Sequence, residues 1–368
     1  MSARAPADVA SDQTRAFTAS SHFCDPRDEP MPKQRTSRAV SPRLGDVARL
    51  AGVSAQTVSN VVNERGGYSD DTRRRVLNAM TRTGYRPNRA AQQLRTRRSR
   101  QIGFPLGRGD DEPDQFVLTF LKALAGAAQP SSHRIVVFAC DRDDTATLQH
   151  WVDTGELDAF AFCAVSPGDP RTRLLTDLRV PFSVMGRTAA DEPQTWVDTD
   201  GRAAMTTIVD YLVGKGHSSF AYLGHRSPAH WTIERRQGVS VALAGHGLRL
   251  APQARLVGSL RSLGRRIDEL LTSRSSPTAL IADSDSLALL AMGRARALGM
   301  RVGSDVAVTG FQSGLYLGAA DPPLTAIRIP VEAAAGHVVG RLVREVESGP
   351  TGLPGLILPT SLTVGRSA

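Results

Sequence analysis

Apolar residues between positions 44 and 63 recur at helical spacing in two short runs. Their faces comprise Leu44, Val47, Ala48 and Ala51 in the first run and Val58, Val61 and Val62 in the second. The pattern predicts two short helices joined by a tight turn at Gly52, with Ser54 as the N-cap of the second helix. A helix-turn-helix of this kind inserts its second helix into the major groove of DNA. We therefore expect these residues to bind DNA.

A third amphipathic segment follows at residues 69–84. Asp70 and Asp71 suit the positively polarised start of a helix, and Gly84 is placed to end it. The apolar stripe expected to be buried comprises Val76, Leu77 and Met80. After a turn, residues 88–95 form one more short helical candidate. The basic first part of the chain is thus predicted to be all-α.

Beyond residue 100 the pattern changes to alternating strand and helix signals. The expected strands are 101–106, 134–139, 157–163, 180–185, 219–223, 278–282 and 306–310. The expected helices are 116–128, 202–215, 233–244, 286–298 and 331–347. This alternation indicates an α/β fold with parallel sheets covered on both faces. Because the segment is long for one such sheet, we expect two lobes with a ligand cleft between them.

Charge supports the division between the two parts. Residues 33–100 hold sixteen Lys and Arg side chains against four acidic ones, whereas the whole chain carries only +9. The remainder is therefore slightly acidic. A basic unit attached to a near-neutral one is typical of proteins that neutralise DNA phosphates. A solvated basic tail is the alternative for residues 33–43, where no apolar periodicity exists.

Composition indicates whether the chain can form a globular core, cross a membrane, be secreted or bind a metal. A hydrophobic content of 41% can form a sizeable core, but the longest apolar runs are far shorter than a membrane span. The first 30 residues contain no hydrophobic signal segment, so we expect a cytoplasmic, nucleoid-associated protein. Cys24, Cys140 and Cys163 lack metal-like spacing, and the last two are expected to be buried thiols. No metal or cofactor is predicted.

These patterns predict four segments. Residues 1–40 are expected to be a disordered leader, in which Met31 is an alternative start, and residues 41–86 a helix-turn-helix domain. Residues 87–100 are expected to form a short helix and a basic linker. Residues 101–368 are expected to form the two-lobed domain that binds an effector and dimerises.

Several motifs extend this interpretation: residues 46–48, 51–54, 57–59 and 62–63, then 87–91, 216–217, 235–238, 277–279 and 322–325. On these motifs, residues 43 to about 366 resemble the lactose-repressor/galactose-repressor (LacI/GalR) family of bacterial transcription regulators. The resemblance implies a sensor like the periplasmic sugar-binding proteins, with two lobes and three crossovers. It also implies a homodimer that binds a pseudo-palindromic double-stranded DNA operator and acts as a repressor.

The resemblance assigns roles in the second helix of the DNA-binding motif. Ala55, Gln56 and Asn60 match its specificity positions in the major groove. The amides of Gln56 and Asn60 can bind an adenine edge, whereas Ala55 can contact only a thymine methyl group. Thr57 and Ser59 are expected to contact phosphates or bases. The alternative for Ser59 is a hydroxyl that bonds to its own helix.

Residues 88–95 match the hinge helix of the family. Leu94 resembles the leucine that wedges into a base step from the minor groove, with packing against the sensor as the alternative. Ala91 is small enough for close approach to the groove, and Asn88 begins the segment. A helix this short is marginal in isolation, so we expect it to fold only on DNA. A ligand that changes the angle between the lobes would then control DNA binding.

The sensor residues implied by the resemblance are partly substituted. Arg235 matches the ligand-contacting arginine of the family, and Arg187 and Trp231 are further candidates, with core packing as the alternative for Trp231. Ser284 replaces the usual asparagine, and Gln312 replaces the usual aspartate. Since an amide both donates and accepts, the substitutions alter the expected effector chemistry. A small-molecule effector, a sugar, is nevertheless expected.

Three function classes follow. The first is a DNA-binding transcription regulator controlled by a small ligand. The second is a DNA-binding regulator whose sensor no longer binds a sugar, as Ser284 and Gln312 suggest. The third is an enzyme that uses Asp283 and Asp285, which would share a face if both lay in a strand. No nucleophile motif or partner histidine accompanies them in the sequence, so we expect no enzyme.

Overall fold

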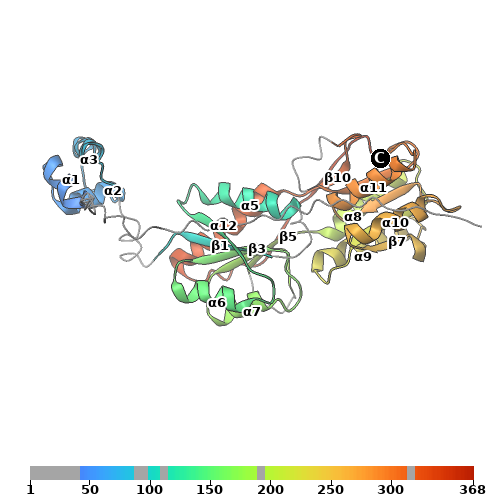
Figure 1. Ribbon diagram of the computed structural model, residues 1–368, viewed down its shortest axis with the longest axis horizontal. Coiled ribbons are helices and arrows are strands. Elements are labelled where there is room, and N and C mark those ends of the chain that lie inside the picture. The colour runs from blue at the N-terminus through green and yellow to red at the C-terminus, as the bar shows by residue number, and fades with distance from the viewer. Residues whose placement is uncertain (1–41, 87–97, 108–114, 189–194, 313–319) are drawn as a thin grey trace, which may run out of the picture. The chain divides into compact units, whose positions relative to one another are not determined.

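The computed structural model describes residues 42–86, 98–107, 115–188, 195–312 and 320–368 (Figure 1). Contacts divide the chain into two compact units. The smaller unit is the helical head, and the larger is the two-lobed sensor. The expected leader and the hinge residues Asn88, Ala91 and Leu94 lie outside the described residues.

The head consists of three helices, α1 (Leu44–Ala51), α2 (Ala55–Val62) and α3 (Asp70–Thr83). Val47, Val58 and Val76 contribute one fully buried side chain from each helix. Gly52 adopts the left-handed conformation, with φ of 63°, that turns the chain between α1 and α2. The predicted helix-turn-helix is confirmed. The buried stripe expected on α3 is wrong at Leu77, because this side chain is 43% exposed and Ala79 is buried instead.

The first sensor lobe contains a six-stranded sheet in the order β11-β5-β4-β3-β1-β2. Its strands are β1 (Gln101–Leu106), β2 (Arg134–Ala139), β3 (Ala159–Cys163), β4 (Phe182–Met185), β5 (Thr195–Thr199) and β11 (Leu356–Leu358). All their pairings are parallel. Figure 1 shows α5 (Gln115–Ala128) and α12 (Val331–Ser348) on one face, and α6 (Thr145–Thr154) and α7 (Pro170–Asp177) on the other.

The second lobe contains a sheet in the order β12-β10-β9-β8-β6-β7. Its strands are β6 (Phe220–His225), β7 (Arg255–Gly258), β8 (Ala279–Ala282), β9 (Ala307–Gln312), β10 (Thr325–Arg328) and β12 (Ser361–Thr363). Only β12 runs antiparallel among these pairings. Helices α8 (Gly201–Gly214) and α9 (His230–Gly245) share one buried cluster, and α10 (Leu260–Leu271) and α11 (Asp285–Ala297) belong to another. The short 3-10 helix η1 (Pro252–Ala254) precedes β7.

The chain passes between the two lobes three times. It leaves the first sheet after β5 for α8, returns after β10 to α12, and crosses again between β11 and β12. The three crossovers and the two parallel sheets confirm the expected α/β sensor. Each lobe is consequently assembled from segments that are distant in sequence.

The sequence prediction identified the central strands and the longest helices but missed several elements. The missed strands are β5, β7, β10, β11 and β12, and the missed helices are α6, α7 and α10. All of these strands have three to five residues, too few for a clear hydrophobic alternation. Cys140 and Cys163 are buried as expected, and Cys24 lies outside the described residues.

Candidate functional site

Helix α2 presents the residues expected to read DNA. Its N-cap is confirmed, since the hydroxyl of Ser54 accepts a hydrogen bond from the backbone N–H of Thr57 at 3.0 Å. Ala55 and Gln56 are exposed, and Thr57 is half-buried with its hydroxyl 2.9 Å from that of Ser54. The start of α2 therefore offers solvent-facing side chains on a capped, rigid turn.

Hydrogen bonds order the polar side chains further along α2. The amide nitrogen of Gln56 donates to Asn60 Oδ1 at 3.0 Å, so these two amides act as one unit. Ser59 engages the end of its own helix, because Asn63 Nδ2 donates to its carbonyl at 2.6 Å and contacts its hydroxyl at 3.4 Å. This arrangement favours the local bonding role for Ser59 over a base contact.

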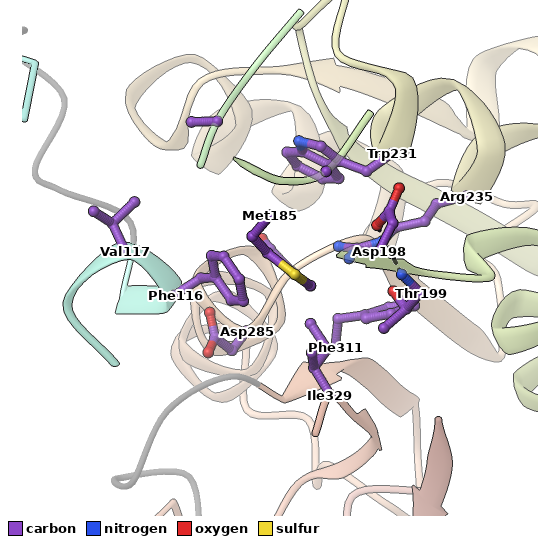
Figure 2. Close-up of a pocket in the computed structure, with 13 residues that line it drawn as sticks. Phe116, Val117, Met185, Asp198, Thr199, Trp231, Arg235, Asp285, Phe311 and Ile329 are labelled. Atoms are coloured by element: carbon purple, nitrogen blue, oxygen red, sulfur yellow. Dashed lines mark hydrogen bonds between the residues drawn. The ribbon is translucent and has the colours of Figure 1, made fainter. Parts of the chain in front are cut away.

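A pocket lies between the two lobes of the sensor (Figure 2). Its empty volume is about 680 Å³, including the part that is open to solvent. The lining residues are Phe116, Val117, Ala164, Met185, Gly186, Asp198, Thr199, Trp231, Arg235, Ser284, Asp285, Phe311 and Ile329. A largely apolar lining with a few polar groups is typical of small-molecule sites.

Arg235 is the central cation of this pocket. The arginine lies on α9, is only 8% exposed, and donates from Nη1 to the backbone carbonyl of Asp283 at 2.5 Å. Its guanidinium carbon lies 3.6 Å from the ring centroid of Phe311 and 4.6 Å from that of Trp231. The two aromatic rings and the carbonyl thus fix the guanidinium in one orientation.

Arg187 does not line the pocket but binds a residue that does. Its Nε donates to Asp198 at 2.9 Å, and its Nη2 donates to Glu234 on α9 at 2.7 Å. Burial alone would lower the pKa of Arg187, but the hydrogen bonds and charges of Asp198 and Glu234 outweigh it and raise this pKa. Because Asp198 belongs to the first lobe and Glu234 to the second, Arg187 joins the lobes.

Ser284 and Gln312, which replace the residues expected from the family resemblance, lie at the carboxyl ends of β8 and β9. Ser284 lines the pocket, but its hydroxyl also caps α11 by accepting from the N–H of Leu287 at 3.3 Å. Asp283 and Asp285 do not share a strand face, because β8 ends at Ala282 and α11 begins at Asp285. This corrects the paired-carboxylate interpretation. Gln312 ends β9, which is hydrogen-bonded to β10.

Trp231, Arg235 and Ser284 line the same pocket, and so do residues that were not predicted as site residues. Phe116, Met185 and Phe311 supply apolar walls. Asp285 supplies a carboxylate in addition to that of Asp198. These residues lie at or near strand ends or helix starts, which is where parallel sheets bind ligands in general, but this position alone does not assign them to one pocket. Apolar strand residues alone cannot be assigned to a pocket from sequence.

Among the described residues, no group of three or more His, Cys, Asp or Glu side chains is arranged to hold a metal ion. None of the described helices combines the length and the apolar character that crossing a membrane requires.

Two parts of the chain match known families. Residues 43–88 match bacterial regulatory proteins of the lacI family, and residues 209–368 match a periplasmic binding protein-like domain. The HTH-type transcriptional regulator AglR of Rhizobium meliloti (strain 1021) is 31% identical over 309 residues, or 82% of this chain and 86% of AglR. RafR of Escherichia coli is 32% identical over 265 residues, or 70% of this chain and 76% of RafR.

Solved structures agree with these matches. The lac repressor dimer bound to operator and the anti-inducer ONPF has a TM-score of 0.74 at 25% identity, and the match covers 89% of this chain and 98% of that chain. The complex of the transcriptional regulator CelR with cellobiose has a TM-score of 0.67 at 26% identity, covering 89% and 100%. Both the head and the sensor are therefore similar to those of ligand-binding DNA regulators.

Proposed function

Because the chain belongs to the lacI family of bacterial regulatory proteins, we propose that it is a transcription repressor whose operator is released when a sugar binds between the sensor lobes. Residues 41–86 form the DNA-binding domain in this proposal, residues 87–100 the hinge and linker, and residues 101–368 the sensor and dimerisation domain. Residues 1–40 are a leader. The protein acts at the nucleoid as a homodimer on a pseudo-palindromic operator.

On the DNA side, the proposed contacts are Ala55, Gln56, Thr57, Ser59 and Asn60 from α2, and Asn88, Ala91 and Leu94 from the hinge. The exposure of Gln56 and its bond to Asn60 support a joint role in base recognition. Ser59 is assigned a phosphate contact at most, since its hydroxyl lies within reach of Asn63.

On the sensor side, the proposed effector-binding residues are Arg187, Trp231, Arg235, Ser284 and Gln312. The observation that carries this assignment is the buried guanidinium of Arg235, held between two aromatic rings at the pocket wall. Its donors suit the oxygens of vicinal hydroxyls, and the indole of Trp231 suits a sugar face. Arg187 contributes by holding Asp198, whose carboxylate can accept from sugar hydroxyls.

Charge narrows the class of sugar. Among the described residues that line the pocket or bond to its walls, Asp198, Asp283 and Asp285 provide three carboxylates, whereas Arg187 and Arg235 provide two guanidinium groups. Glu234, which pairs with Arg187, adds a further carboxylate behind this wall. This excess of negative charge disfavours an anionic ligand. We therefore propose an uncharged sugar rather than a sugar phosphate. The cellobiose held by CelR belongs to this uncharged class.

We propose no catalytic activity. Asp283 is buried and bonded to neighbouring groups, and Asp285 begins a helix, so the two carboxylates lack the shared orientation that paired acid–base catalysis needs.

The test begins with an operator selected from random DNA duplexes, followed by band-shift titrations with cellobiose, maltose, raffinose and glucose 6-phosphate. At least one uncharged sugar should release the operator, and glucose 6-phosphate should not. Arg235→Ala should keep operator affinity while weakening sugar binding by roughly 1.5–3 kcal/mol, or about ten- to over a hundred-fold.

Arg236→Ala is the matched control, because Arg236 is adjacent in sequence but does not line the pocket between the lobes. If the Arg235→Ala variant still releases its operator at the sugar concentration that suffices for the wild-type protein, the assignment is contradicted. Wild-type protein that binds its operator yet responds to no sugar would instead support a sensor that has lost its sugar.

A further inference from the structure

A fully buried carboxylate lies behind the pocket wall. Asp283, directly after β8, is 0% exposed and accepts hydrogen bonds from the backbone N–H of His225 at 2.8 Å and from Tyr222 Oη at 3.3 Å. His225 Nδ1 lies 2.8 Å from its other oxygen. Burial, and then the charge of Asp283, raise the pKa of the Tyr222 phenol, which therefore stays protonated as a donor. Such a paired buried charge is costly to disrupt.

Both ends of this cluster contact the pocket wall. The backbone carbonyl of Asp283 accepts from Arg235 Nη1, and the imidazole of His225 packs against the indole of Trp231 at 5.8 Å between centroids and 63° between planes. Trp231 in turn lies against the guanidinium of Arg235. Neither Asp283 nor His225 is among the residues that line the pocket.

We propose that His225 and Asp283 are positioning residues of the effector pocket. The carboxylate of Asp283 fixes the imidazole, the imidazole supports Trp231, and the carbonyl of Asp283 orients Arg235. Pre-ordered side chains bind a ligand more tightly because less conformational entropy is lost on binding. This inference rests on the proposed function as a sugar sensor. It identifies two residues behind the pocket wall that hold Trp231 and Arg235 in place.

The histidine also gives the cluster a spectroscopic signature. The titratable and charged groups around it are Asp283 after β8, Tyr222 on β6 and Arg235 on α9, with Arg236 close enough to influence the phenol. Because the imidazole packs against the indole, loss of this ring in His225→Asn should alter the fluorescence of Trp231.

The first experiment compares the tryptophan fluorescence of the unliganded full chain and its variants at one fixed pH. All variants carry Trp151→Phe, because the ring of His150 lies 6.3 Å from that of Trp151. His225→Asn should change the emission of this background. The control is His230→Asn, which removes the histidine next to Trp231 in sequence and should leave the emission unchanged. An unchanged emission in His225→Asn would overturn the contact.

The second experiment measures sugar affinity by calorimetry and operator affinity without sugar. His225→Asn and Asp283→Asn should each weaken sugar binding tenfold or more, while operator affinity stays within twofold. Asp268→Asn, which removes a carboxylate paired with Arg294 outside the pocket, should change neither affinity. Unchanged sugar binding in His225→Asn would overturn the proposal, and this variant decides the question if Asp283→Asn fails to fold.

Failure of the wild-type chain to bind any sugar would refute the proposed function instead. The fluorescence comparison remains decisive in that case, since it requires no ligand and tests directly whether His225 holds Trp231.

Discussion

Gln56 shows how a single exposed amide can carry sequence recognition. Its side chain is solvent-facing on the first turn of α2 and already bonded to Asn60, so its orientation is partly fixed before DNA arrives. Gln56→Ala should relax base preference at one position per half-site and cost about 1–3 kcal/mol on the preferred operator. Competitive selection on operator variants measures both effects.

Asn78→Ala is the control for this change, since it removes an exposed amide from α3 rather than α2. It should leave base preference unaltered. If Gln56→Ala weakens binding to all DNA sequences equally, the amide contacts phosphate. The face of α2 assigned here to base recognition would then be wrong.

The ion pair between Arg187 and Glu234 makes a second prediction at the scale of the residue. Both side chains are partly buried, and the pair crosses from one lobe to the other. Glu234→Gln should lower the free energy of unfolding of the sensor by about 1 kcal/mol, because Arg187 loses one of its two charged partners. Urea unfolding followed by circular dichroism gives this value.

Glu269→Gln provides the comparison, since its partner Arg265 is 89% exposed and such pairs contribute little. We expect a change below about 0.5 kcal/mol for it. Equal effects of the two substitutions would mean that the pair between the lobes is no stronger than a surface pair.

Among the helices, α8 and α9 pack closely because one residue of α9 has no side chain. A Cβ placed on Gly238 would lie 2.9 Å from both the Cα and the carbonyl oxygen of Arg202 on α8. Gly238→Ala should therefore push the helices apart and destabilise the sensor by about 1–3 kcal/mol. It should also weaken sugar binding, since Arg235 lies one turn earlier on α9. Thermal unfolding and calorimetry test the two consequences.

Gly336→Ala is the matched helical glycine, with no atom within 4 Å of the added Cβ. It should be neutral or stabilise by up to about 1 kcal/mol, because alanine is the better helix former. A destabilisation equal to that of Gly238→Ala would assign the effect to helix chemistry instead of to packing.

Two strands of the first lobe and three residues of the pocket show how much of the structure could be predicted from the sequence. The strands 101–106 and 134–139 were predicted with the bounds observed, since each is a clear apolar run. Asp198 and Phe311 could not be placed in the pocket, because their proximity depends on how two sheets face each other. Arg235 was identified only through family resemblance, and the aromatic rings around it became visible only in the folded chain.

At the scale of the whole molecule, the two ends of the chain should differ in their importance. Deletion of residues 1–37 should keep operator affinity within a few-fold, because these residues show no apolar face. Deletion of residues 350–368 should prevent sensor folding, since it removes β11, β12 and the buried Ser367. Band shifts and circular dichroism measure the outcomes. A tenfold loss of affinity on the first deletion would show that the leader takes part in DNA binding.

The triple crossover between the lobes also sets the order of events during synthesis on the ribosome. The head is complete once residue 86 has emerged, but the first sensor lobe waits for α12 and β11, which follow every described element of the second lobe except β12. Domains that finish early fold while the rest of the chain is still being made. A nascent chain should therefore carry a folded DNA-binding head long before it carries a ligand-responsive sensor.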